Sequence, residues 1–457
     1  MPPITRRHTL AAAAAALAAT PLGRAAAQAP APMPDRPLFG ARLWRLDNGL
    51  SVAFVENHRA PVIAQYLYLA AGGGEDPPGR SGVAHFLEHM MFKGSPNVPS
   101  GAFSRRVARE GGNDNAFTSR DVTAYFQQVE ASRLPLVMAM EADRLAAALI
   151  PQDELESERN VVLEERRQRT DSTPRGRFGE AFRAALWGPQ SWPGRPIIGW
   201  EDEIRATTRD DLAGFYDRFY APANATLVIA GAVREATLRA LVQEHYGRIP
   251  ARRGAGRDRP APAALPHEPR LIRREPQARE ALMMRGWKAP SLTTPEARHA
   301  LPLEVLAHLL GGGQGSRLYA ALVESGLASA AGASYDAEAA GVTEFTLWAM
   351  PRRGVTPERV EQEAAAALAR LLQEGPTEAE VARSTRQISA GALLALDSFG
   401  AAPRMLGGVL AIGLPADVVE FWPARLRAVT REQVEQAARA VLGAAPATTG
   451  WLLPESA

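Results

Sequence analysis

Hydrophobic and polar positions divide the first half of the chain into strands followed by helices. Residues 43–58 carry β-branched and aromatic positions on either side of Asn48 and Gly49, which predicts two strands joined by a tight turn. Residues 61–73 predict a third strand, and apolar residues at helical spacing then predict a helix over residues 81–92. Strands therefore precede the first helix.

Strand and helix patterns recur further along the first half. Residues 115–129 have the β-branched and aromatic content of a strand, and we predict them as one element. The pattern favours helices over residues 131–150 and 151–169, and an apolar run predicts another strand at residues 224–233. This mixture indicates a domain built from both a sheet and helices.

A segment rich in proline, arginine and glycine interrupts the pattern at residues 251–270, and we interpret it as a linker. This linker predicts an N-terminal domain at residues 38–250 and a C-terminal domain at residues 271–457. The two halves are similar in size. Two domains with cores of their own fit a chain of 457 residues.

The second half repeats the order of elements of the first. A predicted strand at residues 281–289 precedes a predicted helix at residues 300–310, and a glycine-rich loop and further strands follow. When this helix is laid over residues 85–89, only His308 matches a histidine. We therefore expect a homologous second domain that lacks the metal motif described below.

The amino-acid composition excludes several kinds of functional site. With 46% hydrophobic and 22% charged residues, the chain is typical of a globular protein, and its net charge of +2 gives no reason to expect nucleic acid as a partner. The chain has no cysteine, which excludes disulfides, thiolate metal ligands and a cysteine nucleophile. A zinc site would therefore use histidine and carboxylate.

The first residues are typical of an export signal. Residues 1–29 have a basic start, an alanine-rich apolar run and small residues around a cleavage region. Arg6 and Arg7 favour the twin-arginine route, although general secretion stays open. No cysteine follows the run and no later stretch is apolar enough to span a membrane, so we expect no membrane anchor. A periplasmic or secreted bacterial protein is the expectation.

The stretch "HFLEH" is the strongest candidate for chemistry. His85 and His89 are four residues apart, so on a helix both imidazoles face the same side, with Glu88 beside them. Two histidines on one zinc ion and a carboxylate that holds a water are the arrangement of the inverted H-x-x-E-H zinc peptidases. The plain alternative is a helix face that happens to carry two histidines.

Two histidines need a third ligand. The predicted helix at residues 151–169 is rich in acidic side chains, and its plain alternative is a solvated charged helix. Glu158 and Glu165 share one face, two turns or roughly 10 Å apart, so one would bind the ion directly and the other support it. Spacing alone does not choose among the candidates, which are Asp153, Glu154, Glu156, Glu158, Glu164 and Glu165.

In this order, the stretches "HFLEHMMFKGS", "GGNDNAFTSRDVTAYFQQV", "EADRL" and "ERNVVLEERRQR" resemble the pitrilysin/insulinase family of zinc metallopeptidases. The closest branch is that of the mitochondrial processing peptidase β-subunit and its short bacterial relatives. The resemblance covers nearly all of the chain after the signal. It implies an α+β fold of two homologous domains, each a mostly antiparallel sheet covered by helices.

The resemblance also implies roles for individual residues. Glu165 would complete the metal site with His85 and His89, one zinc ion would bind per chain, and Glu158 would be a supporting acidic residue at the catalytic site. Glu88 would act as the general base. An edge strand would pair with the backbone of a peptide substrate through Asn115, Ala116 and Phe117, whose plain alternative is a core strand.

The chain departs from the family's pattern at one place. Relatives hold the substrate with an arginine and a tyrosine in the C-terminal half, and Val323 and Ala330 stand at the matching positions here. Neither side chain can donate a hydrogen bond. The resemblance then implies a heterodimer in which a homologous, non-catalytic subunit supplies this clamp, or alternatively a homodimer with a relocated clamp.

These features predict a zinc-dependent endopeptidase that hydrolyses short or unfolded peptides inside a chamber. The rival hypothesis is a non-catalytic scaffold or binding subunit of the same fold that retains a structural zinc ion.

Overall fold

The computed structural model describes residues 36–264, 267–396 and 398–455. The predicted signal at residues 1–29 lies outside these ranges. Within the described part of the chain, no helix has both the length and the apolar character that crossing a bilayer requires.

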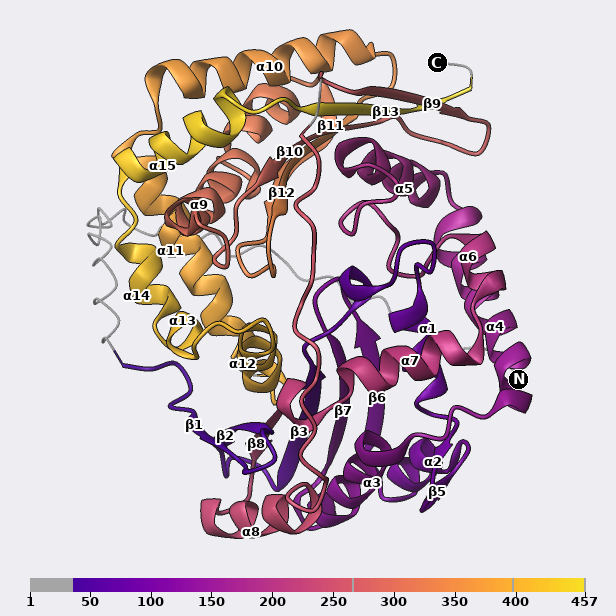
Figure 1. Cartoon of the computed structure of the whole chain (residues 1–457). Coiled ribbons are helices and arrows are strands. Elements are labelled where there is room, and N and C mark those ends of the chain that lie inside the picture. The colour runs from indigo at the N-terminus through magenta and orange to yellow at the C-terminus, as the bar shows by residue number, and fades with distance from the viewer. Residues whose placement is uncertain (1–35, 265–266, 397, 456–457) are drawn as a thin grey trace, which may run out of the picture. The chain divides into compact units, whose positions relative to one another are not determined.

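The first half of the described chain contains a six-stranded, mostly antiparallel sheet (Figure 1). From edge to edge its strands are β1 (Arg42–Arg45), β2 (Ser51–Glu56), β8 (Ala225–Gly231), β3 (Val62–Leu69), β7 (Thr123–Glu130) and β6 (Asn113–Thr118). β1 and β2 pair antiparallel on either side of Asn48 and Gly49, as the sequence predicts. β2 and β8 are the parallel pair of this sheet. A short ribbon of β4 (Gly94–Ser95) and β5 (Val98–Pro99) lies outside it.

The prediction of one strand at residues 115–129 is wrong. The structure has two antiparallel strands there, β6 and β7, with Thr118 opposite Thr123. Ser119 stabilises the turn because its hydroxyl oxygen accepts the N–H groups of Asp121 at 3.1 Å and Val122 at 3.0 Å. This hairpin places β6 at the edge of the sheet, and among the described residues no strand pairs with its outer side.

The second half contains a five-stranded sheet with a matching order. Its strands are β11 (Ala328–Tyr335), β12 (Thr343–Pro351), β10 (Leu282–Ala289), β13 (Thr448–Pro454) and β9 (Arg270–Glu275). β13 and β9 are the parallel pair of this sheet. The order matches β6, β7, β3, β8 and β2 of the first sheet, and each central strand, β3 or β10, precedes the helix that covers its sheet. The predicted α+β duplication is confirmed.

Helices accompany both sheets. Those of the first half are α1 (Val83–Met90), α2 (Ala102–Arg109), α3 (Leu134–Ala147), α4 (Gln152–Arg166), α5 (Pro174–Trp187), α6 (Glu201–Ala206), α7 (Arg209–Phe219) and α8 (Glu235–His245). Those of the second half are α9 (Ala300–Gly311), α10 (Pro357–Glu374), α11 (Glu378–Ala395), α12 (Ala401–Ala411), α13 (Asp417–Glu420), α14 (Trp422–Arg427) and α15 (Arg431–Ala438).

The two halves exchange one helix each. α5 of the first half contacts β13, β9 and β10 of the second sheet, and α12 of the second half contacts β3 and β8 of the first (Figure 1). Gly450 of β13 leaves room for α5, since a Cβ atom there would lie 2.8 Å from the ring of Phe182. Leu406 and Val409 of α12 are buried in one cluster with Tyr68 of β3. Each sheet is therefore covered partly by the other half of the sequence.

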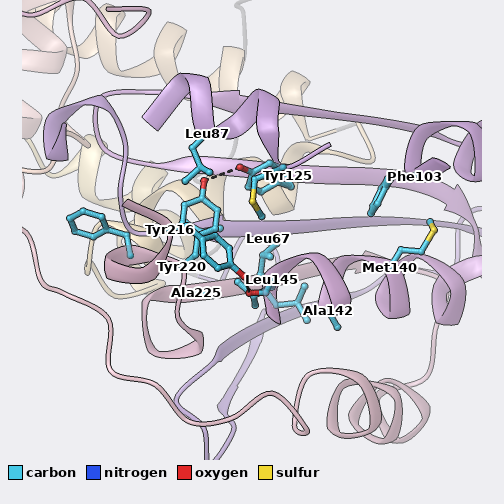
Figure 2. Packing of buried hydrophobic residues seen from close by; sticks show 14 of the residues in the cluster. Leu67, Leu87, Phe103, Tyr125, Met140, Ala142, Leu145, Tyr216, Tyr220 and Ala225 are labelled. Carbon is cyan, nitrogen blue, oxygen red and sulfur yellow. Dashed lines mark hydrogen bonds between the residues drawn. The ribbon is translucent and has the colours of Figure 1, made fainter. Parts of the chain in front are cut away.

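The largest buried cluster of the first half lies beneath α1. Leu87 on the inner side of α1 is buried in one cluster with Tyr125 of β7 and Tyr220, and Figure 2 shows part of this packing. The hydroxyl groups of Tyr125 and Tyr220 are 2.8 Å apart and hydrogen bond, so neither buried phenol is left unsatisfied. This packing fixes the direction in which the opposite face of α1 points.

Candidate metal centre

Helix α1 presents the "HFLEH" side chains. It begins after Gly82, whose φ of 89° suits a residue without a Cβ atom. The carboxylate of Asp76 accepts the N–H groups of Gly82 at 2.7 Å and Ala84 at 2.8 Å, which caps the helix. Ser81 does not cap this helix; its hydroxyl oxygen accepts the N–H of Trp200 at 2.9 Å. The helix therefore starts from a fixed point, one turn before the first histidine.

His85, His89 and Glu165 converge. One ligand atom from each of the three lies within 4.8 Å of the other two. Oε2 of Glu165 is 3.2 Å from Nε2 of His89 and 3.6 Å from Nε2 of His85. Ligands about 2.0–2.1 Å from one tetrahedral zinc ion are roughly 3.3 Å apart, so these separations fit a shared ion. The donor set of two imidazoles and one carboxylate also suits zinc.

Glu158 lies behind His89 and is not one of the converging atoms. Its Oε1 atom accepts a hydrogen bond of 2.8 Å from Nδ1 of His89, and its other oxygen pairs with the ammonium of Lys93. A carboxylate on Nδ1 fixes the tautomer of an imidazole and leaves Nε2 free to bind a metal. Of the two carboxylates that share this face, Glu165 contributes an atom to the converging group and Glu158 contacts His89 from behind.

Glu165 is held from its other side by Arg169. The guanidinium of Arg169 lies 2.6 Å from Oε1 of Glu165, which leaves Oε2 for the two histidines. Arg169 belongs to a π-helical turn, Arg167–Asp171, that continues α4. The sequence interpretation overlooked this arginine, although its position four residues after Glu165 is a typical spacing for an ion pair on a helix.

Glu88 lies beside the histidines on α1. Burial raises the pKa of its carboxyl, and a hydrogen bond from Thr118 opposes that shift. The Thr118 hydroxyl donates to Oε2 of Glu88 at 2.6 Å. Thr118 is the last residue of β6, so the edge strand and the candidate base are joined directly. The sequence interpretation named the three residues before Thr118 and missed the threonine itself.

The surroundings of the two histidines shift their pKa values in opposite directions. Burial, together with the nearby His89, lowers the pKa of His85 to about 4, so its ring is neutral near pH 7 and able to bind a metal. Burial of His89 also disfavours a charged ring, but hydrogen bonds to Glu158 and Glu165 outweigh it and raise the pKa of His89 to about 9. The carboxylates thus favour positive charge at this position, whether from a proton or from a metal ion.

These residues open into one cavity of about 930 Å³. Asn115, Ala116 and Phe117 of β6 line it together with the histidines and Glu88. Phe117 is not a core residue, since 37% of its surface is exposed and its ring meets that of Tyr68 edge-on. The cavity therefore combines a possible metal site with a strand edge that has no partner among the described residues.

Val323 and Ala330 lie elsewhere in the fold. Val323 belongs to a π-helical turn, Tyr319–Glu324, and Ala330 belongs to β11. Neither side chain lines the cavity at the histidines.

Comparisons with known proteins agree with these features. The family model described as Insulinase (Peptidase family M16) matches residues 51–191, and the one described as Peptidase M16 inactive domain matches residues 206–388. The zinc protease PqqE of Helicobacter pylori is 30% identical over 348 residues, which cover 74% of this chain and 76% of that protein. The mitochondrial-processing peptidase subunit beta of Lentinula edodes is 26% identical over 377 residues, 79% of each chain.

A solved structure shares this fold over most of the chain. The crystal structure of a protease from Helicobacter pylori matches with a TM-score of 0.82 at 25% sequence identity, covering 92% of this chain and 100% of that one. The family that the sequence motifs resemble is thereby confirmed: the chain belongs to the insulinase family of zinc proteases, peptidase family M16.

Proposed function

We propose that this protein is a zinc-dependent endopeptidase with one zinc ion per chain. The observation that carries the proposal is the convergence of His85, His89 and Glu165 in the cavity that Glu88 and the open edge of β6 also line. In this proposal the two histidines and Glu165 are the metal ligands. Relatives named zinc proteases support the choice of metal.

A zinc ion held by these ligands would act as a Lewis acid toward a water molecule and the peptide carbonyl. Glu88 would take the proton of that water and pass it to the leaving amine. Thr118 holds the Glu88 carboxylate from the strand side at 2.6 Å, which limits its rotation. Glu158 orients the ring of His89 and thereby acts on catalysis through the metal site.

The substrate in this proposal is an extended peptide. An edge strand offers unpaired N–H and C=O groups that can capture a peptide backbone with little demand on sequence. Asn115, Ala116 and Phe117 lie on that strand and line the cavity. A substrate that must bind in an extended conformation is a short or unfolded peptide, because a folded protein does not present a free strand.

A partner subunit is part of the proposal. Val323 and Ala330 offer no hydrogen-bond donor in place of the family's arginine and tyrosine. A homologous, non-catalytic subunit that supplies both would close a chamber over the cavity, and one relative is itself named a subunit. A homodimer with a relocated clamp is the alternative. We place this assembly in the periplasm or outside the cell, on the basis of residues 1–29.

The test is peptide hydrolysis by the zinc-loaded chain, alone and with a homologous partner, with zinc content measured alongside. Glu88→Gln is the matched control because it keeps the size of the side chain and removes the base. Activity that requires the partner and falls at least about 10²-fold in the control is expected. Full activity of the isolated chain would contradict the heterodimer. A zinc-loaded chain that cleaves nothing with any partner would favour the scaffold hypothesis.

A further inference from the structure

A second cavity, of about 390 Å³, lies at the end of the edge strand. Residues of both halves line it, among them Arg120 and Arg183 of the first and Tyr335 of the second. Thr118 lines the cavity at the histidines, and Ser119 and Arg120 line this one. Thr118 ends β6 and Arg120 follows two residues later, in the turn of the hairpin. The two cavities are thus neighbours along the chain.

Arg120 is a buried cation with two nitrogen atoms that lack an acceptor. Its Nε and Nη2 atoms are buried and have no hydrogen-bond partner among the described residues. Burial lowers the pKa of this guanidinium to about 10, so it stays charged at neutral pH. A buried guanidinium whose donors lack an acceptor destabilises the fold. Such a side chain is expected where an anion binds.

Nearby carboxylates are already engaged. Glu344 accepts from Arg183 at 3.0 Å and from the indole N–H of Trp187 at 2.8 Å. Arg259 pairs with both Glu75 and Asp121. Glu344 and Asp121 also attract the charge of Arg120 across this cavity, but neither accepts a hydrogen bond from its buried Nε or Nη2 atom.

One further carboxylate lines the cavity. Asp336 accepts the backbone N–H of Glu338 at 2.9 Å, and burial raises the pKa of its carboxyl. It forms no ion pair with Arg120 within the described parts of the chain, so it does not take the place of an anionic ligand.

The form of the cavity indicates which anion fits. The planar guanidinium of Arg120 matches a carboxylate, which can accept two parallel hydrogen bonds. Trp187, Trp192 and Tyr335 line the same cavity and supply aromatic surface. The volume of about 390 Å³ is far larger than a lone carboxylate needs, so an amino-acid residue that carries the carboxylate suits it better.

We infer that Arg120 binds a carboxylate of the peptide that lies along β6. This inference rests on the proposed peptidase function and adds a substrate class to it: peptides with a free C-terminus or an acidic side chain a few residues from the metal site. The C-terminal carboxylate and the acidic side chain share one chemistry, and the experiment distinguishes them.

The experiment measures binding to the non-hydrolysing Glu88→Gln protein by calorimetry and by tryptophan fluorescence. Three acetylated six-residue peptides of one sequence serve as probes: a free C-terminus, a C-terminal amide, and the amide with one glutamate in place of glutamine. We expect at least tenfold tighter binding of one or both carboxylate peptides than of the amide. The peptide that binds tighter identifies the source of the carboxylate.

Variants of Arg120 test its part in this preference. Arg120→Met should abolish the preference and Arg120→Lys should weaken it, while Arg175→Met, at a surface ion pair with Glu280, should leave it intact. The melting temperature of Arg120→Met should not fall, because the variant removes a buried charge with donors that lack an acceptor. Equal binding of all three peptides, or a preference that survives in Arg120→Met, would overturn the inference.

N-acetylglutamate, titrated alone, separates this inference from the peptidase proposal. Its binding should depend on Arg120 even if no peptide binds at β6, and in that case the peptidase proposal fails alone. If peptides bind and are cleaved with no dependence on Arg120, the inference fails alone.

Discussion

Nδ1 of His89 lies 2.8 Å from Oε1 of Glu158, while Nε2 of the same ring faces Glu165 at 3.2 Å. Each nitrogen of the imidazole thus has its own carboxylate. The first carboxylate orients the ring, and the second converges with it on the space where a metal ion fits.

Glu158→Gln tests the orienting carboxylate. The amide is a weaker acceptor, so the ring of His89 is held less firmly, and we expect zinc affinity to fall about 10–100-fold. A competition titration with a coloured chelator measures this change. Glu154→Gln is the control, because the carboxylate of Glu154 lies 3.5 Å from the ammonium of Lys93 and is not among the converging atoms. Equal losses in both variants would mean that the total negative charge near the site, not the orientation of His89, sets the zinc affinity.

Thr118→Val tests the link between the edge strand and Glu88. Valine keeps the shape and removes the hydroxyl that donates to Glu88 at 2.6 Å. A hydrogen bond to a charged group contributes about 1.5–3 kcal/mol, so kcat should fall on the order of tenfold or more, with zinc content unchanged. Ser104→Ala removes a similar bond of 2.7 Å to Asp114 at the surface and should keep full activity. An unchanged kcat in Thr118→Val would show that Glu88 needs no such support.

Gly407→Ala tests the exchange of helices between the halves. A Cβ atom at Gly407 of α12 would lie 2.0 Å from the ring of Tyr68 on β3, so the helix would have to move off the first sheet. We expect a loss of about 1–3 kcal/mol in the free energy of unfolding. A Cβ atom at Gly408, the next residue, would have no atom within 4 Å. Gly408→Ala should therefore raise the free energy of unfolding by about 0.5–1 kcal/mol, because alanine favours a helix over glycine. Denaturant unfolding measures the change in the free energy of unfolding for each variant. The two changes have opposite signs if α12 covers this sheet, and the same sign if it does not.

Glu380 gives a pH-dependent contribution to stability. Burial opposes its charge, but hydrogen bonds from Arg317 and Thr377 outweigh burial and lower its pKa from 4.5 to about 2. Because the pKa of the folded state is depressed, the contribution is complete above pH 4.5 and is lost as the pH falls toward 2.

Glu380→Gln should therefore lower the free energy of unfolding at pH 7, by on the order of 1 kcal/mol after solvent screening. The difference from the unsubstituted protein should shrink in unfolding curves taken below pH 4.5. Glu374→Gln, at an exposed position on the preceding helix, is the control. A difference that stays constant with pH would show that the charge of Glu380 is not what stabilises the fold.

The sequence predicted the site more completely than the arrangement around it. Helical spacing alone puts His85, Glu88 and His89 on one face, because residues three and four apart on a helix are neighbours. Choosing Glu165 from several carboxylates required the family resemblance, since spacing left the choice open. Thr118 was missed because it acts on Glu88, which is far away in the sequence, whereas Arg169 was overlooked although its helical spacing to Glu165 is typical of an ion pair.

Local patterns also predicted most strands and helices, because burial imposes periods of two and of about 3.6 residues on the chain. The exception, residues 115–129, contains a turn whose signal was masked by β-branched and aromatic neighbours. That turn decides that β6 is an edge strand and that Arg120 lies in a cavity of its own. The pattern of one strand does not determine which strands pair with it, so the position of β6 at the edge of the sheet could not be predicted from local sequence.

By itself, then, the sequence determined most strands and helices and the two-histidine face, which follow from short-range periodicity. It also indicated the duplication, through the repeated order of elements and the family resemblance. Only the tertiary structure decided that α5 covers the second sheet and α12 the first, and that two buried nitrogen atoms of Arg120 find no acceptor among the described residues. The physical reason is that long-range packing and charge pairing depend on which surfaces meet, and residues far apart in the chain make those surfaces together.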